Sequence, residues 1–193
     1  DLTFDNIYHE HCNYWTVISL KTFFDNLHLK IYKIEKINTH GGSLRVYTTM
    51  NESEKIHPSV NRFIKKEIEA GLNKFITYKN FGLAVEKTKI NSLNKINKIV
   101  SQKRKIIGYG APAKATTILN YYGLTDSQIE YTLDDNELKQ GKFIPGTKIQ
   151  IIAPDNIELT KFDYVLVLAW NFFNQIQEKL SSIFKTSQFI KLK

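Results

Sequence analysis

Hydrophobic and polar positions in the first third of the chain follow first a helical pattern and then a strand pattern. Apolar residues at helical spacing follow Thr16: Val17, Leu20, Phe23, Phe24 and Leu27. They predict a helix that Thr16 caps. Residues 29–37 and 43–50 alternate as two paired strands do, with a turn at 39–42 between them. Strict alternation in the first strand puts Ile31 and Ile34 on opposite faces.

Two helices are expected between residues 58 and 101. Gly71 marks the end of the first helix, whose apolar face consists of Val60, Phe63, Ile64, Ile68 and Leu72. The second helix is expected from about residue 78 to residue 101, with an apolar stripe of Leu83, Ile90, Leu93, Ile96 and Val100. Its lysines lie largely off this stripe, which is typical of a solvated face.

Strands and helices alternate in the last part of the chain. Strands are expected at 106–109, 129–133, 147–152, 162–170 and 188–192, and helices at 113–122 and 171–184. The run 162–170 is almost continuously apolar, as expected for a strand buried on both faces of a parallel sheet. This rhythm predicts an α/β fold with a Rossmann-like parallel sheet.

Composition narrows the class of protein. The chain has 193 residues and 42% hydrophobic content, enough for a globular fold with a buried core. Its net charge of +8 comes largely from dispersed lysines without clustered arginines, so nucleic acid is not an expected partner. Cys12 is the only cysteine, and no apolar run approaches the length of a membrane span. We expect a cytoplasmic protein without a membrane partner; the sequence does not predict its oligomeric state.

Residues 108–114, here called the glycine turn, link an expected strand to an expected helix. Gly108, Gly110 and Ala113 reproduce the G-x-G-x-x-(G/A) spacing of dinucleotide-binding proteins. Asp134 follows the next strand, where such proteins bind a ribose hydroxyl, and Lys114 could reach a phosphate. The competing interpretation is a turn that only closes a strand-to-helix connection.

Residues 8–11, here called the histidine segment, place Tyr8, His9, Glu10 and His11 in a row. Three interpretations remain open. His9 and His11 could share a face and bind a metal, although no third ligand stands at a recognisable spacing. The histidines could bond only to neighbouring loops. An imidazole beside a carboxylate and a phenol could also act in acid–base catalysis.

Residues 40–45 form a third candidate. His40 and Arg45 flank two glycines and could face an anionic ligand. The same glycines could serve only a hairpin turn, because glycine adopts positive φ without strain.

Taken together, the motifs of this chain resemble the C-terminal half of S-adenosylmethionine-dependent sugar-nucleotide C-methyltransferases. The resemblance covers nearly the whole chain. It rests on the histidine segment, residues 40–45, the glycine turn, Lys139-Gln140-Gly141-Lys142, Pro145-Gly146-Thr147 and Trp170-Asn171. It implies that residues 1–55 are the end of a donor-binding domain, 56–103 a helical linker and 104–193 a Rossmann-like C-terminal domain.

The resemblance also implies a reaction and its residues. A nucleotide-linked keto sugar would be methylated on a carbon next to its ketone, with His11 as general base and Glu10 and Tyr8 positioning that base or the sugar. His9 has no assigned role. Lys114, Gly108, Gly110, His40 and Arg45 are the expected contacts of the substrate. S-adenosylmethionine and zinc would belong to parts of a longer parent that precede Asp1, so we expect no cofactor in this chain and no turnover by it alone.

Two other functions compete with methyl transfer. Residues 104–193 could bind a nicotinamide dinucleotide or another nucleotide without chemistry of their own. They could also be purely architectural and close an active site over its substrate.

Overall fold

The computed structural model describes residues 2–38 and 42–192, which fall into two compact units. The α/β unit combines Asp1–Cys12 with Leu83–Lys193, and the hairpin unit is Asn13–Gly82. The histidine segment therefore packs with the C-terminal part of the chain. These units do not follow the expected boundaries at residues 55 and 103. The expected boundaries follow from the family resemblance, in which residues 1–55 end a donor-binding domain. That division stays a prediction.

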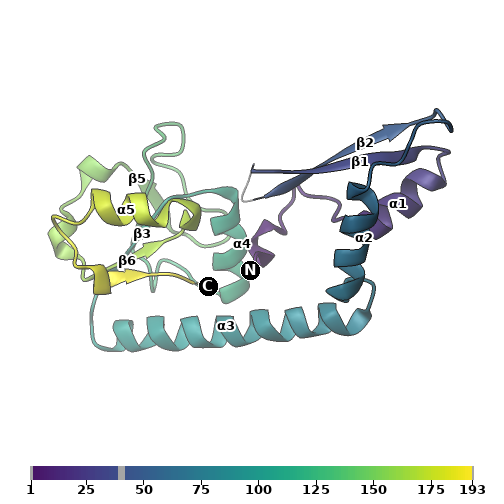
Figure 1. Ribbon diagram of the computed structural model, residues 1–193. Coiled ribbons are helices and arrows are strands. Elements are labelled where there is room, and N and C mark those ends of the chain that lie inside the picture. Colours follow the sequence, from purple (N-terminus) through teal and green to yellow (C-terminus); the bar gives the residue numbers. More distant parts are fainter. Residues whose placement is uncertain (1, 39–41, 193) are drawn as a thin grey trace. The chain divides into compact units, whose positions relative to one another are not determined.

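A five-stranded parallel sheet forms the centre of the α/β unit, which confirms the Rossmann-like fold (Figure 1). Its spatial order is β5-β4-β3-β6-β7. The strands are β3 Ile106–Tyr109, β4 Tyr131–Leu133, β5 Gln150–Ile152, β6 Tyr164–Val167 and β7 Phe189–Ile190. The chain reverses its direction of travel across the sheet between β3 and β6, where proteins of this topology usually bind ligands.

Helices cover both faces of this sheet. The α-helices are α3 Phe75–Ser101, α4 Ala113–Tyr122 and α5 Phe173–Lys179. On one face α3 and α4 contribute Ile96 and Leu119, both fully buried, and on the other α5 contributes Ile176. The short 3-10 helices are η1 Phe4–Asn6, η2 Pro154–Asn156, η3 Leu159–Lys161, η4 Trp170–Phe172 and η5 Thr186–Gln188.

The expected apolar strand 162–170 is shorter in the structure, because β6 ends at Val167. The backbone N–H groups of Leu168 and Ala169 both donate to the carbonyl of Tyr109, at 2.9 and 3.3 Å. Two donors on one carbonyl end the regular ladder, and the chain turns into η4. The residues after β6 thus leave the sheet directly beside the glycine turn.

The hairpin unit contains the helix and two strands expected from the first third of the chain. Its elements are α1 Val17–Asp25, β1 Lys30–Ile37, β2 Ser43–Thr49 and α2 Ser59–Glu69. Thr16 caps α1, as predicted, through a capping box with Ser19. The expected alternation in β1 is wrong: a register shift between Ile31 and Lys33 puts Ile31 and Ile34 into the same buried cluster.

Candidate functional site

The residues that precede the histidine segment attach it to the α/β unit. Phe4 is buried, and its ring stacks on Tyr122 with centroids 6.0 Å apart. Asp5 is fully buried, and its carboxylate accepts a 2.5 Å hydrogen bond from the indole Nε1–H of Trp170. The Thr117 hydroxyl of α4 donates to the carbonyl of Ile7 at 3.3 Å. Figure 1 shows this N-terminal stretch beside α4.

His11 is held by Asn6, just before the histidine segment, and by Tyr8 within it. Its Nδ1 lies 2.8 Å from the carbonyl oxygen of Asn6, and its ring centroid lies 4.2 Å from that of Tyr8. Because a carbonyl only accepts hydrogen bonds, Nδ1 carries the proton of this bond. In the neutral ring Nε2 then carries the lone pair, which is the form required of a general base.

His9 and Glu10 lie at the surface. Their Nε2 and Oε1 atoms are 3.9 Å apart, with side chains 85% and 67% exposed. An ion pair this exposed contributes little to stability. Glu10 thus lies close to His9, and its proposed role in positioning the base or the sugar stays a prediction.

A cavity of about 140 Å³ brings Tyr8 together with Lys114. Its lining residues are Tyr8, Pro112, Ala113, Lys114, Leu168, Ala169, Trp170, Asn171 and Phe172. The Lys114 ammonium lies 4.9 Å from the centroid of a Trp170 ring, a cation–π distance. We call this cavity the Lys114 pocket. It joins two stretches that the sequence singled out separately.

The glycine turn has its glycines for reasons of packing. A Cβ on Gly110 would lie 2.5 Å from the Cβ of Ala169, and the residue has φ +89°. A Cβ on Gly108 would lie 2.7 Å from the Thr132 hydroxyl oxygen. Gly108 is buried within β3, so a direct contact with substrate stays a prediction without structural support.

Asp134 occupies the position at which a dinucleotide-binding protein would bind ribose, but its carboxylate is bonded to the fold. It accepts hydrogen bonds from the backbone N–H of Ala111 at 2.7 Å and of Asn136 at 2.9 Å, and from Lys139 at 3.1 Å. Burial opposes the charge of this carboxylate, yet these donors outweigh burial and hold its pKa below the usual range. The backbone N–H of Ala111 in the glycine turn is therefore bonded to a carboxylate of the protein itself.

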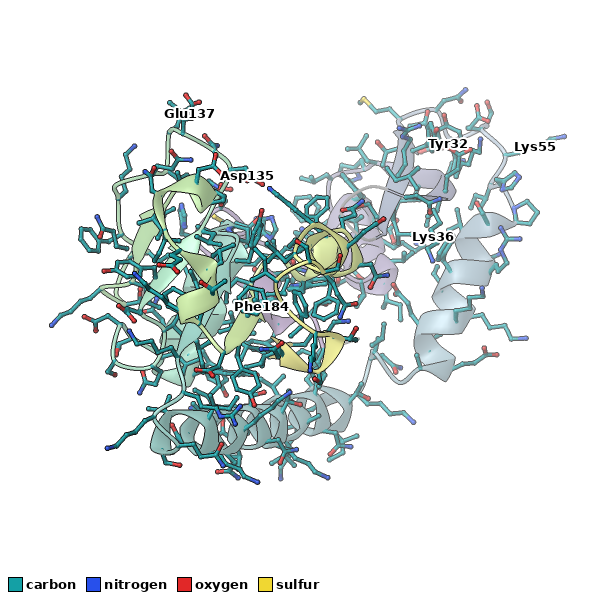
Figure 2. The ribbon with its side chains drawn as sticks, turned by 90° about the vertical axis from the view of Figure 1, so that its left-hand side faces the viewer. Tyr32, Lys36, Lys55, Asp135, Glu137 and Phe184 are labelled. Carbon is teal, nitrogen blue, oxygen red and sulfur yellow. The ribbon has the colours of Figure 1, made fainter. Side chains whose placement is uncertain are left out.

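A second cavity, of about 260 Å³, opens at the carboxyl ends of β3 and β4. Tyr109 lines it, and the tyrosine hydroxyl donates to Asp135 at 3.1 Å. Lys179 of α5 donates to the same carboxylate at 2.8 Å. Burial raises the pKa of Tyr109, so the phenol stays protonated at neutral pH. Figure 2 shows Asp135 and Glu137 on the loop that follows β4.

Arg45 belongs to the hairpin unit. It lies exposed on β2 opposite Glu35 of β1. Hydrogen bonds from Lys33 and Tyr47, with the nearby charge of Arg45, hold the pKa of Glu35 below its usual range. His40 lies outside the described residues. The contacts of both residues with a substrate stay predictions.

Across residues 2–38 and 42–192, no group of three or more His, Cys, Asp or Glu side chains gathers as a metal site requires. The helices in this part of the chain also lack the combination of length and apolar character needed to cross a membrane.

Comparison with known proteins identifies the family. Residues 38–191 match the family described as C-methyltransferase C-terminal domain. The chain belongs to this family. It is also 32% identical, over 174 residues, to C-methyltransferase NovU of Streptomyces niveus, and the alignment covers 90% of this chain and 41% of NovU. The chain thus spans about two fifths of the length of that relative.

In this C-methyltransferase C-terminal domain the structure adds residues that the sequence analysis missed. Asp5 and Asn6 had no assigned role, although one is bonded to Trp170 and the other holds His11. A possible signal for Asp5 was its place directly after Phe4, because a charged side chain is buried only where partners satisfy it. No sequence signal could have pointed to the carbonyl of Asn6, since every residue carries a backbone carbonyl.

Proposed function

We propose that this chain is the C-terminal part of an S-adenosylmethionine-dependent C-methyltransferase that methylates a nucleotide-linked keto sugar on a carbon next to its ketone. Membership of the C-methyltransferase C-terminal domain family supports the reaction class. The observation that carries the proposal is the Lys114 pocket, which Tyr8 and Lys114 line from separate stretches of the chain. A phenol and an ammonium in one pocket suit a substrate with a sugar and a phosphate.

His11 is the proposed general base. Methylation of a carbon next to a ketone requires removal of a proton and stabilisation of the resulting enolate. The hydrogen bond between Nδ1 of His11 and Asn6 favours the tautomer with its lone pair on Nε2. Nε2 would take the proton, and the imidazolium formed would keep its Nδ1–H on the same carbonyl.

Lys114 is the proposed contact for the anionic end of the substrate. Its ammonium lies against Trp170 and keeps hydrogen atoms to donate. A volume of about 140 Å³ suits a single group such as a sugar ring or a phosphate rather than a whole nucleotide sugar. The remainder of the substrate would lie beyond this pocket.

S-adenosylmethionine supplies the methyl group in the proposed reaction. The glycine turn does not fit this donor, because the N–H of Ala111 is already bonded to Asp134. We therefore assign the donor to another part of a longer parent, with zinc in that part as well, and expect the 193-residue chain alone not to turn over.

Deuterium exchange tests the base separately from methyl transfer. In the intact parent, His11→Ala should slow incorporation of solvent deuterium next to the ketone by about 10²- to 10⁴-fold. His9→Ala, the matched control in the same segment, should leave the rate within about twofold. Wild-type exchange by His11→Ala would refute the assignment of the base.

Ligand titration tests the alternatives to this function. The bonds of Asp134 to the turn disfavour a nicotinamide dinucleotide site and are compatible with a purely architectural role. Calorimetric titration of the chain with NAD and with a thymidine-linked sugar separates the three possibilities. Binding of the sugar nucleotide alone supports the proposal, binding of NAD contradicts it, and binding of neither favours the architectural role.

A further inference from the structure

One side chain connects the histidine segment to the Lys114 pocket. The indole of Trp170 donates its N–H to the buried carboxylate of Asp5, while Lys114 lies 4.9 Å from its ring centroid. The same indole lines the pocket together with residues of the glycine turn. Trp170 thus contacts both Asp5, which precedes the histidine segment, and Lys114, the proposed contact of the substrate.

The carboxylate of Asp5 stands next to the group that orients His11. Asp5 is fully buried, and a buried carboxylate is costly unless donors satisfy it. The next residue, Asn6, offers its carbonyl to Nδ1 of His11 at 2.8 Å. Asp5 and Asn6 are adjacent in η1, where the N–H of Asn6 donates to the carbonyl of Thr3 at 3.0 Å and the N–H of Ile7 to that of Phe4 at 2.9 Å. Fixing the carboxylate therefore fixes the carbonyl.

We propose that Trp170 is a positioning residue: its indole N–H holds Asp5 and thereby sets the carbonyl of Asn6 that selects the tautomer of His11. Trp170 acts here through Asp5 and does not touch the reacting atoms. The catalytic meaning of this link rests on the proposed function, but the link itself is a property of the 193-residue chain and is tested without turnover.

Hydrogen exchange of the chain tests whether the link holds the segment. Trp170→Phe keeps an aromatic ring and removes the N–H donor. Amides of residues 7–11, including those of Tyr8 and His11, which donate to the carbonyls of Asn6 and Tyr8, should exchange at least about tenfold faster. Trp15→Phe, in the hairpin unit, is the matched control and should leave these rates unchanged. Retained protection of Ile106–Tyr109 will show that the sheet is still folded.

The tautomer of His11 separates a positioning role from a merely stabilising one. Imidazole ¹⁵N shifts of His11 should report the Nδ1–H form in the wild-type chain and a loss of that form in Trp170→Phe. Asp5→Asn keeps an acceptor oxygen and should retain the wild-type signature, whereas Asp5→Ala should behave as Trp170→Phe does. The double variant Asp5→Ala/Trp170→Phe should be no worse than either single variant.

Two results would overturn the proposal: unchanged exchange and tautomer signals in Trp170→Phe, or additive losses in the double variant. These results are independent of the base assignment. If the link is found but the parent carrying His11→Ala still exchanges deuterium at the wild-type rate, the proposed function fails and the positioning of His11 by Trp170 stands.

Discussion

The glycine turn and the histidine segment belong to the same α/β unit, yet the fold treats their polar groups in opposite ways. In the glycine turn the N–H of Ala111 is bonded to Asp134, and Gly110 is pressed against Ala169. In the histidine segment the side chains of His9, Glu10 and His11 lie exposed. The glycines of a motif that suggests a ligand can thus serve packing, while a short polar stretch stays accessible for chemistry.

Loss of the Phe4 anchor should have the largest effect on stability. Phe4→Ala removes a buried aromatic ring from its stack with Tyr122 and should lower the free energy of unfolding of the α/β unit by about 3–5 kcal/mol. Urea denaturation in a Trp15→Phe background, where Trp170 reports on this unit, gives the value. Ile7→Ala, at a side chain 57% exposed, should cost far less. Equal costs would mean that the segment is not anchored by Phe4.

A side chain added to the glycine turn should lower the free energy of unfolding somewhat less than loss of the Phe4 ring does. Gly110→Ala adds a Cβ 2.5 Å from Ala169 at a residue with φ +89°, and we expect a loss of about 2–4 kcal/mol. Gly141→Ala is the matched control, because Gly141 has φ +77° with no atom near the added Cβ. The difference between the two variants in thermal unfolding measures the contact alone. A difference near zero would show that the turn has room for a ligand.

Asp134, which is bonded to the glycine turn, should make the stability of the chain depend on pH. The folded chain holds the pKa of Asp134 below its usual range, so the unfolded chain binds a proton there at a higher pH. The stability from this carboxylate is present above the usual value of about 4 and is lost as the pH falls through the lower folded value. Asp134→Asn should cost about 1–3 kcal/mol at neutral pH and flatten the loss of stability in acid.

Urea midpoints of the wild type and of Asp134→Asn, measured between neutral pH and pH about 3, check this prediction. The gap between the two curves should narrow as the solution becomes more acidic. A gap that stays constant would mean that the carboxylate does not supply the charge that the turn binds.

The smallest effect is expected in the histidine segment itself. His9→Ala removes an exposed ring whose partner Glu10 is 3.9 Å away, so the free energy of unfolding should change by less than about 0.5 kcal/mol. Thermal unfolding at low and high salt measures this change. A clearly larger loss of unfolding free energy that does not depend on salt would mean that His9 helps to hold the segment. The exposed histidine segment would then differ less from the internally bonded glycine turn.

Periodicity in the sequence predicted the order and type of the elements better than their ends. The alternation after residue 104 predicted a parallel sheet, because strands buried on both faces are continuously apolar. It did not predict that β6 ends at Val167, since this depends on two N–H groups that share the carbonyl of Tyr109. The prediction of which β1 residues share a face was also wrong, because nothing in the residue types indicates the register shift after Ile31.

For the candidate site, the sequence indicated the titratable side chains and missed what holds them. Tyr8 and Lys114 were chosen for their chemistry, and only the folded chain brings them into one pocket. Its spacing from the glycine turn made Asp134 a candidate for binding ribose. The same spacing is compatible with a carboxylate that is bonded to the turn itself. The link from Asp5 to Trp170 depends on a contact across the length of the chain that no local pattern contains.

The contact between Asp5 and Trp170 joins positions 165 residues apart and so has a consequence for the newly made chain. At ribosomal rates of about 5–20 residues per second, on the order of ten to thirty seconds pass before Trp170 follows Asp5 out of the peptidyl transferase centre. During this time the carboxylate of Asp5 lacks its indole donor. The contact that holds the histidine segment therefore forms only after Trp170 has been made, long after the residues of the segment itself.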